Sequence, residues 1–113
     1  MNIQIFGTKG CFDTQKAERY FKERKITYQY VDLRKYGLSK GEFDSVKATV
    51  GLKDLIKSEA KEYKSLNIQQ LGIGSVAAEV LYKNPKLYRS PIVRNGKLAT
   101  VGYQPEIWKD WEK

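Results

Sequence analysis

A chain of 113 residues with 41% hydrophobic and 30% charged residues is predicted to fold as one globular domain over residues 1–113, because this composition excludes extensive disorder. The formal net charge of +8 would suit nucleic acid, an acidic protein or an oxyanion, but basic and acidic residues alternate, so direct nucleic-acid binding is not expected. With no secretory signal at its start and no apolar run near the roughly 20 residues that span a bilayer, the protein is expected in the cytoplasm and not in membranes.

The first third of the sequence predicts a strand, a helix and a second strand. A short apolar run at Ile3–Phe6 ends in a glycine-containing loop, which carries the one cysteine, Cys11. From Asp13 onward apolar residues recur at helical spacing, with Asp13 or Thr14 as the cap, and the β-rich segment 26–32 follows. Because a βαβ crossover joins parallel strands, Cys11 is expected at the carboxyl end of the first strand, where open α/β sheets place their sites.

The middle of the chain is predicted to be helical. Ser39 precedes Glu42 by three residues, which is the spacing of a capping box, and the helix that follows is expected to continue to Gly51. Further helices are predicted at 52–66 and 75–82, where apolar residues recur at helical intervals.

The last third predicts a hairpin and a closing helix. Asn95-Gly96, between two β-rich runs, is the preferred pair for a type I′ turn, and Pro105 suits the first turn of a helix. Ile107 is expected on the apolar face of that helix. Three aromatic residues are expected to pack in or against the core: Tyr103, Trp108 and Trp111. The whole order predicts an α/β fold in which a βαβ unit, a helical insertion and a ββα unit form a four-stranded mixed sheet covered by helices.

Cys11 is the residue best suited to chemistry. A thiol between a strand and a helix lies near the backbone amides of the helix N-terminus, which stabilise a thiolate or bind an oxyanion. Lys9 would add positive potential, and Thr14 would donate a hydrogen bond to the sulfur. The residues alone leave open the alternative that Cys11 is a small, inert core side chain. With one cysteine and no histidine, neither an internal disulfide nor a zinc-ligand cluster is expected.

Two segments carry a resemblance to a known family. Residues 7–17, with Cys11 directly after a glycine, and residues 90–103, with Pro91 ahead of the Asn-Gly turn, resemble the ArsC/Spx family of arsenate-reductase-like proteins. The resemblance extends over nearly the whole chain. It implies a thioredoxin-like fold with a helical insertion, and it implies that Pro91 is a cis-proline opposite the active-site cysteine.

The resemblance also implies a site. In arsenate reductases of this family the cysteine attacks arsenate, three arginines bind the anion, and glutathione or glutaredoxin resolves the thiol–arsenic adduct. Cys11 corresponds to the nucleophile. At the three arginine positions this chain has Lys57, then Ser90 with Arg89 beside it, and Gln104. Because Lys and Gln lack the planar fork with which Arg binds a tetrahedral oxyanion, the substrate stays open between arsenate and another small oxyanion or thiol.

Our first hypothesis is therefore a thiol-dependent oxidoreductase with Cys11 as nucleophile, no bound cofactor or metal, and external glutathione or a glutaredoxin-like protein as reductant. Its anion-binding residues are expected to be Lys9, Thr14, Lys57, Arg89 and Gln104. Arg94 is a further candidate, against the ordinary alternative of a solvated side chain beside a strand.

Two alternatives to this hypothesis stay open. One is a non-catalytic Spx-like transcriptional regulator that binds the RNA polymerase α subunit. Regulators of that branch commonly carry a Cys-x-x-Cys pair, whereas this chain has Cys11 and Thr14 at those positions. The other is a thioredoxin-like scaffold without chemistry.

Overall fold

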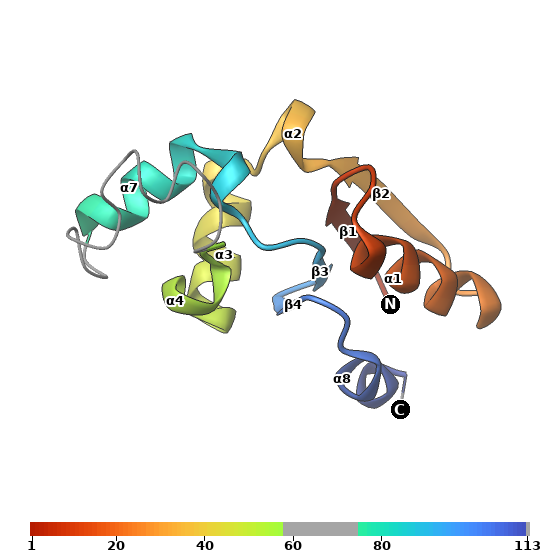
Figure 1. The fold of residues 1–113 in the computed structure, drawn as a ribbon. Helices are drawn as coiled ribbons and strands as arrows, with labels where there is room; N and C mark the ends of the chain where they lie inside the picture. The colour runs from red at the N-terminus through yellow and green to blue at the C-terminus, as the bar shows by residue number, and fades with distance from the viewer. Residues whose placement is uncertain (58–74, 113) are drawn as a thin grey trace.

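The computed structural model describes residues 1–57 and 75–112, and its centre is one four-stranded sheet (Figure 1). The strands are β1 (Ile3–Gly7), β2 (Tyr28–Asp32), β3 (Ile92–Asn95) and β4 (Leu98–Val101). In the order β2-β1-β3-β4, β1 and β2 are parallel, whereas β1 with β3 and β3 with β4 are antiparallel. The predicted mixed sheet is confirmed.

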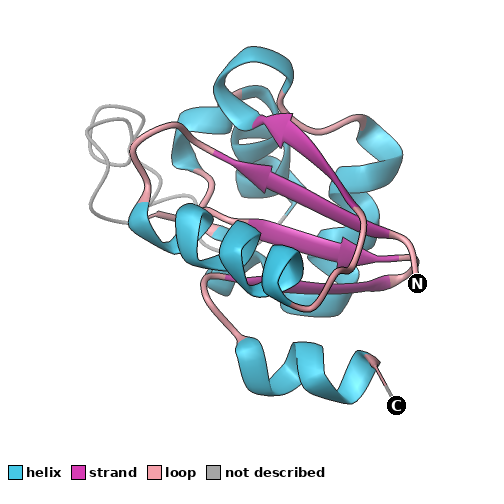
Figure 2. Ribbon diagram, turned by 90° about the vertical axis from the view of Figure 1, so that its right-hand side faces the viewer, coloured by secondary structure: helices cyan, strands magenta, loops and turns pink. Residues whose placement is uncertain are grey.

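Helices cover both faces of this sheet (Figure 2). Those in the described residues are α1 (Phe12–Glu23), α2 (Leu33–Tyr36), α3 (Lys40–Val50), α4 (Leu52–Leu55), α7 (Ser75–Lys83) and α8 (Pro105–Trp111), with a short 3-10 helix, η1, at Pro85–Leu87. None of the helices in the described ranges is both long enough and apolar enough to cross a membrane.

The two faces of β1 serve two separate cores. Ile3 and Ile5 belong to one core, to which α1 contributes Phe21 and α8 contributes Trp108. Phe6 belongs to the other core, which α3, α4 and α7 complete. Successive side chains of a strand point to opposite faces, so the run at Ile3–Phe6 supplies both cores at once. β1 is thereby fixed from both sides, and the loop at its carboxyl end starts from a rigid element.

The first helix begins one residue earlier than predicted. Cys11 itself is the N-cap residue, with φ −83° and ψ 118°, so Asp13 and Thr14 lie inside the first turn instead of capping it. The loop before the helix is closed by the N–H of Cys11, which donates to Thr8 O at 3.2 Å. The thiol makes no capping hydrogen bond. It is therefore free to interact with other parts of the chain.

The second strand is shorter than the predicted segment 26–32. Lys25 has a positive φ of 59°, and the N–H of Ile26 donates to Phe21 O at 2.9 Å. These two residues turn the chain at the end of α1, so pairing with β1 begins only at Tyr28.

The capping box of the helical insertion is confirmed. Ser39 Oγ accepts from the N–H of Glu42 at 3.2 Å, and Glu42 Oε1 accepts from the N–H of Ser39 at 2.9 Å, so α3 starts at Lys40. The helix predicted at 75–82 is confirmed as α7.

The helix predicted at 52–66 is confirmed at Leu52–Leu55 and wrong at the two described residues that follow. Helix α4 ends at Leu55, and Ile56 instead forms an isolated antiparallel bridge with Tyr88. Two backbone bonds flank the bridge, from Lys57 N–H to Leu87 O at 2.6 Å and from Arg89 N–H to Leu55 O at 2.9 Å. Pairing with a distant segment thus overrides the local helical spacing. The remainder of that prediction lies outside the described residues.

The predicted hairpin is confirmed, but its predicted turn type is wrong. Asn95 pairs with Leu98, so the two turn residues are Gly96 and Lys97. Only Gly96 has a positive φ, of 61°, which matches the first central residue of a type II′ turn; type I′ requires a positive φ at both positions. Asn95 stays in the strand, where its Oδ1 accepts from the N–H of Asn2 at 3.1 Å.

The closing helix starts with Pro105 in its first turn, as predicted. Trp108 is fully buried and Trp111 packs against the same core. Ile107 is 44% exposed, contrary to the prediction, because Trp108 and Trp111 lie three positions apart and take the inner face of this short helix. Tyr103 is 40% exposed, although its ring contacts Trp108 edge-on with centroids 5.7 Å apart.

Candidate functional site

Cys11 lies where the sequence predicted it, at the carboxyl end of β1 in the loop that leads into α1. Because β1 and β2 are parallel, with Gly7 opposite Asp32, the chain that follows β2 leaves the sheet at this same edge. Cys11 is a free cysteine and is partly exposed. The residues that surround its sulfur therefore come from several segments that meet at one edge of the sheet.

The sulfur of Cys11 contacts a residue near the other end of the chain. Ser90 Oγ donates a hydrogen bond to Cys11 Sγ at 3.2 Å, and the thiol S–H points to Ser90 O at 3.7 Å. The peptide bond between Ser90 and the buried Pro91 is cis, as the resemblance implies. Since β3 begins directly after Pro91 and pairs with β1, the sheet itself brings Ser90 to the thiol.

Thr8 extends this contact into a short chain of hydroxyl groups. Thr8 Oγ1 lies 3.3 Å from Ser90 Oγ. A hydroxyl group has a single proton, so when Ser90 donates to the sulfur, Thr8 must be the donor to Ser90. The proton of Thr8 then points to Ser90 and the proton of Ser90 points to the sulfur of Cys11. This arrangement favours a negative charge on the sulfur.

Thr14 forms the inner wall behind the thiol. The residue is 2% exposed, and its Oγ1 is buried without a hydrogen-bond partner among the described residues. It packs directly against Gly7, where a Cβ would lie only 2.7 Å from Thr14 Oγ1 and closer still to its Cγ2. A glycine is needed at this position so that the first turn of α1 can approach the end of β1.

The surroundings of the sulfur favour the thiolate. Partial burial of Cys11 opposes ionisation, but the hydroxyl groups of Ser90 and Thr14 and the backbone N–H groups of Thr14 and Asp13 stabilise the negative charge and outweigh the effect of burial. The pKa of Cys11 therefore lies below the ordinary value of a cysteine. Of these groups, the Ser90 hydroxyl is the one that also reaches hydrogen-bond distance of the sulfur.

A pocket of about 460 Å³ opens beside the thiol. It is lined by Cys11, Asp13, Lys57, Arg89, Ser90, Val101 and Gly102. Two of the predicted anion-binding residues, Lys57 and Arg89, thus reach the pocket of the cysteine. The guanidinium of Arg89 is held at its base, because Nε donates to Ile56 O at 3.1 Å.

Other predicted residues do not reach this pocket. Lys9 is exposed on the loop before Cys11 and is not among the described residues that line the pocket. Gln104 is also exposed; its Nε2 donates to Val101 O at 3.2 Å at the start of α8.

Arg94 has a structural role. One of its guanidinium nitrogens, Nη1, donates to Gln4 Oε1 at 2.9 Å and lies 3.8 Å from Glu42 Oε2. These contacts join β3 to β1 and α3, and Arg94 is not among the described residues that line the pocket of Cys11. The solvated alternative is wrong as well, since the Arg94 side chain is only 16% exposed.

Sequence reasoning missed the contribution of Ser90 and Thr8. The resemblance places Ser90 at an arginine position, which drew attention to a lost anion ligand instead of a gained hydrogen-bond donor. The available signal was the neighbourhood: Ser90 precedes Pro91, which the resemblance places opposite the cysteine, and Thr8 shares the loop of Cys11. Within residues 1–57 and 75–112, no group of three or more His, Cys, Asp or Glu side chains is arranged to hold a metal ion.

Comparison with known proteins identifies the family of the chain and similar folds. Residues 6–111 match the model of the ArsC family. The global transcriptional regulator Spx 2 of Oceanobacillus iheyensis is 29% identical over 110 residues, which cover 94% of this chain and 80% of that protein. The arsenate reductase from Vibrio cholerae has a TM-score of 0.84 at 20% identity, with 97% of each chain covered. The glutaredoxin-like NrdH-redoxin from Escherichia coli has a TM-score of 0.50 at 12% identity, covering 97% of this chain and 93% of that one.

The two structural likenesses show the thioredoxin-like α/β fold, and they show only the fold, because their identities are low. The family model, in contrast, covers residues 6–111, which include the cysteine loop, the strands β2 to β4 and the closing helix. On that match the chain belongs to the ArsC family.

Proposed function

We propose that this chain is a thiol-dependent oxidoreductase in which the thiolate of Cys11 is the nucleophile. One observation carries the proposal: the thiol, at the N-terminus of α1, accepts a hydrogen bond from Ser90 Oγ at 3.2 Å, and its pKa is lowered. The thiolate is the form of cysteine that attacks disulfides and other electrophiles. A cysteine that only fills space would be expected in apolar surroundings, which raise its pKa.

The pocket beside Cys11 supports a small anionic substrate. Lys57 and Arg89 contribute positive charge to its lining, and Asp13 contributes one negative charge. Arg89 can bind an oxyanion through two parallel hydrogen bonds, whereas Lys57 acts as a point charge. We therefore propose either a small oxyanion such as arsenate or a disulfide of a small anionic thiol as the substrate class.

With a disulfide RS–SR, the proposed reaction has two balanced steps. The Cys11 thiolate attacks one sulfur, so a bond from Cys11 to that sulfur forms while the S–S bond of the substrate breaks and RS⁻ leaves. A second thiolate then attacks the mixed disulfide and releases Cys11 as a thiolate. Because the chain has one cysteine, this second thiol comes from outside, with glutathione or a glutaredoxin-like protein as the proposed donor.

The first test is the rate at which iodoacetamide alkylates Cys11 as a function of pH, with and without arsenate or phosphate. The expected result is an apparent pKa below the free-cysteine value of about 8.5 and slower alkylation in the presence of the anion. Turnover of arsenate, or of a small anionic disulfide, with glutathione is the second test, with Cys11→Ser as the inactive control. A thiol that titrates near 8.5 without anion protection, together with turnover that survives Cys11→Ser, would reject the proposal.

The sequence relatives support a second candidate function. The curated relative Spx 2 is named as a global transcriptional regulator, and it matches nearly the whole of this chain. As the alternative, we propose a non-catalytic protein that binds the RNA polymerase α subunit. A redox switch through a Cys-x-x-Cys pair is not part of this alternative, because Thr14 occupies the second position.

The two candidates differ in what Cys11→Ser does. For a regulator of this kind, isothermal titration with the purified α subunit under reducing conditions should give the same affinity for the wild type and for Cys11→Ser, without turnover of any thiol substrate. Absence of binding at low salt would remove this alternative, whereas loss of thiol turnover in Cys11→Ser would support the first.

A further inference from the structure

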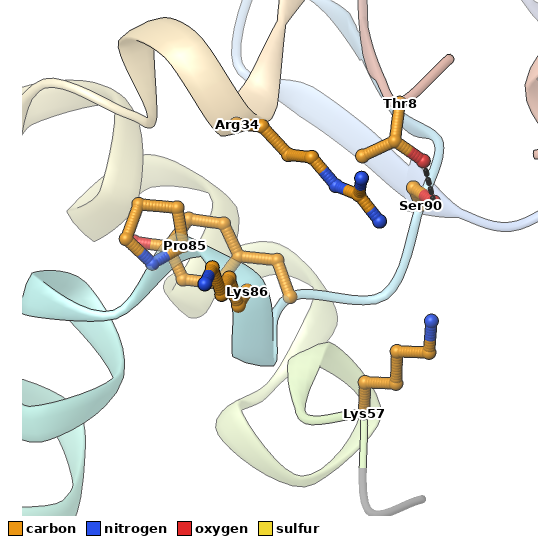
Figure 3. A pocket seen from close by; sticks show the side chains of 7 residues that line it. Thr8, Arg34, Lys57, Pro85, Lys86 and Ser90 are labelled. Carbon is orange, nitrogen blue, oxygen red and sulfur yellow. Dashed lines mark hydrogen bonds between the residues drawn. The ribbon is translucent and has the colours of Figure 1, made fainter. Parts of the chain in front are cut away.

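A second cleft, of about 350 Å³, adjoins the pocket of Cys11 and shares Lys57 and Ser90 with it. Its described lining consists of Thr8, Arg34, Lys57, Pro85, Lys86, Tyr88 and Ser90 (Figure 3). Cys11 and Arg89 are not part of this lining. The cleft therefore lies beside the thiol pocket and has a different set of lining residues, apart from the two that they share.

Three basic side chains from three separate segments meet at this cleft. Arg34 belongs to α2, Lys57 follows α4, and Lys86 belongs to η1. Figure 3 shows the guanidinium of Arg34 directed toward Thr8 and Ser90, with the amine of Lys57 directed toward the same space from below. The described lining includes no carboxylate. An anion bound between Arg34 and Lys57 would be attracted by both of their charges.

The fold fixes the backbone positions of these three residues relative to one another. Asp32 Oδ1 accepts from the backbone N–H of Arg34 at 3.0 Å, which caps α2 directly after β2. Gly37, with a φ of 61°, ends α2 close to Pro85, since a Cβ there would lie 3.1 Å from Pro85 Cγ. Helix α2 therefore packs against η1, and the bridge between Ile56 and Tyr88 holds the residue before Lys57 beside the same segment.

A neutral group of the cleft adds a hydrogen-bond donor on one side. Figure 3 shows the hydroxyl groups of Thr8 and Ser90 there; that of Thr8 can donate to a bound anion, whereas the proton of Ser90 Oγ is donated to Cys11 Sγ. Tyr88 contributes only its ring, because its own hydroxyl donates to Tyr82 O at 3.0 Å. A guanidinium fork, ammonium groups and a hydroxyl donor around a small cavity are the groups that bind phosphate in proteins. The volume lies at the lower end of the roughly 300–1,000 Å³ typical of small-ligand sites.

We propose that this cleft is a second anion site, which binds the phosphate group of a small ligand and is separate from the site of the Cys11 thiol. Arg34 is its principal ligand, because it alone among the described lining residues can bind a phosphate through two parallel hydrogen bonds. The proposal does not depend on whether Cys11 is catalytic, since Cys11 is not part of the described lining of the cleft.

An anion bound in the cleft should change the ionisation of the Cys11 thiol. Thr8 has one hydroxyl proton, which it can donate either to Ser90 or to a bound anion. An anion that accepts this hydrogen bond removes the bond from Thr8 to Ser90, which favours the thiolate. The negative charge of the anion also disfavours the thiolate, so both effects raise the pKa of Cys11. Phosphate in the cleft is therefore expected to slow alkylation of Cys11 near neutral pH without touching the sulfur.

The test is a titration of the full-length protein with inorganic phosphate at constant ionic strength, followed by calorimetry and by NMR shifts of backbone amides. Saturable binding is expected, with shifts at Arg34 and Thr8. Arg34→Gln should weaken the affinity that is read from the amide shifts of Thr8 and Lys86 at least tenfold. Arg89→Gln, with the same change of charge in the pocket of Cys11, should change the affinity read from those two shifts less than twofold. Both side chains are exposed, so neither substitution disturbs the core. A parallel titration with glycerol phosphate distinguishes free phosphate from a phosphate ester, because tighter binding of the ester identifies the ester as the ligand class.

Cys11→Ser separates this proposal from the proposed function, because it removes the thiol and leaves the cleft intact. Phosphate binding should persist in this variant. Binding that is lost in Arg89→Gln or Cys11→Ser but kept in Arg34→Gln would assign the anion to the thiol pocket and overturn the proposal. Absence of saturable binding by the wild type would overturn it as well.

Discussion

The hydroxyl of Ser90 donates a hydrogen bond to the sulfur of Cys11 at 3.2 Å, across 79 positions of the sequence. The position of Cys11 at the start of α1 is set by neighbouring residues, but this bond depends on the pairing of β3 with β1. The reactivity of the thiol is therefore in part a property of the assembled sheet.

Removal of the Ser90 hydroxyl should make the thiol less acidic. In Ser90→Ala the pKa of Cys11 is expected to rise toward the ordinary cysteine value, because a hydrogen bond to a charged group contributes more than one to a neutral group. Alkylation by iodoacetamide at pH 7 should slow about three- to tenfold. Ser39→Ala is the matched control, since Ser39 caps α3 and has no contact with the thiol. An unchanged rate in Ser90→Ala would contradict the role of this bond.

Thr14→Val should make the protein more stable and the Cys11 thiol less reactive. Valine has nearly the shape of threonine, and it removes a buried hydroxyl that has no hydrogen-bond partner among the described residues. An unsatisfied buried polar group costs about 1–3 kcal/mol, so the free energy of unfolding in urea should rise by about 1 kcal/mol. At the same time the pKa of Cys11 should rise, because the Thr14 hydroxyl favours the thiolate. Thr14→Ser keeps the hydroxyl and should keep the alkylation rate.

Gly7→Ala tests the close approach of β1 and α1. The new methyl group would lie 2.7 Å from Thr14 Oγ1, so Thr14 must move, and a loss of about 1–3 kcal/mol in the free energy of unfolding is expected from overpacking. Gly41→Ala in α3 is the control: its Cβ meets nothing within 4 Å, and alanine should stabilise that helix by about 0.5–1 kcal/mol. Equal stabilities of the two variants in urea would argue against the contact.

The lowered pKa of Cys11 predicts how stability depends on pH. A group that is more acidic in the folded state binds fewer protons there than in the unfolded chain, at any pH between its two pKa values. Its stabilising contribution is complete above the unfolded pKa of about 8.5 and is lost as the pH falls through the folded pKa. The wild type should therefore gain stability relative to Cys11→Ser as the pH rises through this window. Urea unfolding of both proteins in reductant, from pH 6 to pH 9.5, measures the difference; parallel curves would refute the shift.

Much of the fold could be predicted because its signals are local. The run at Ile3–Phe6, the capping box at Ser39 and the glycine turn at Gly96 each lie within a few residues, and together they predict which elements follow one another along the chain. Two elements were missed or misjudged, for different physical reasons. Helix α2 has only four residues and is capped locally by Asp32, the last residue of a strand, so it leaves no helical period in the sequence. Ile56 leaves its helical pattern because it pairs with the distant Tyr88.

The same division applies to the site. Cys11 could be placed from sequence, because a strand, a glycine loop and a helix follow one another directly. The contact with Ser90 could not be predicted, since the reach of a side chain depends on how β3 docks. The cationic cleft was missed because Arg34, Lys57 and Lys86 lie far apart and form no charge cluster in the sequence.

The distance in sequence between Cys11 and Ser90 has a consequence for synthesis of the protein. A ribosome makes Cys11 long before Ser90, so the growing chain carries the thiol without the hydroxyl that makes it acidic. During that interval a smaller fraction of Cys11 is thiolate, so the cysteine is a weaker nucleophile toward oxidants and disulfides. The thiol gains its full reactivity only when the last third of the chain has been translated and β3 has paired with β1.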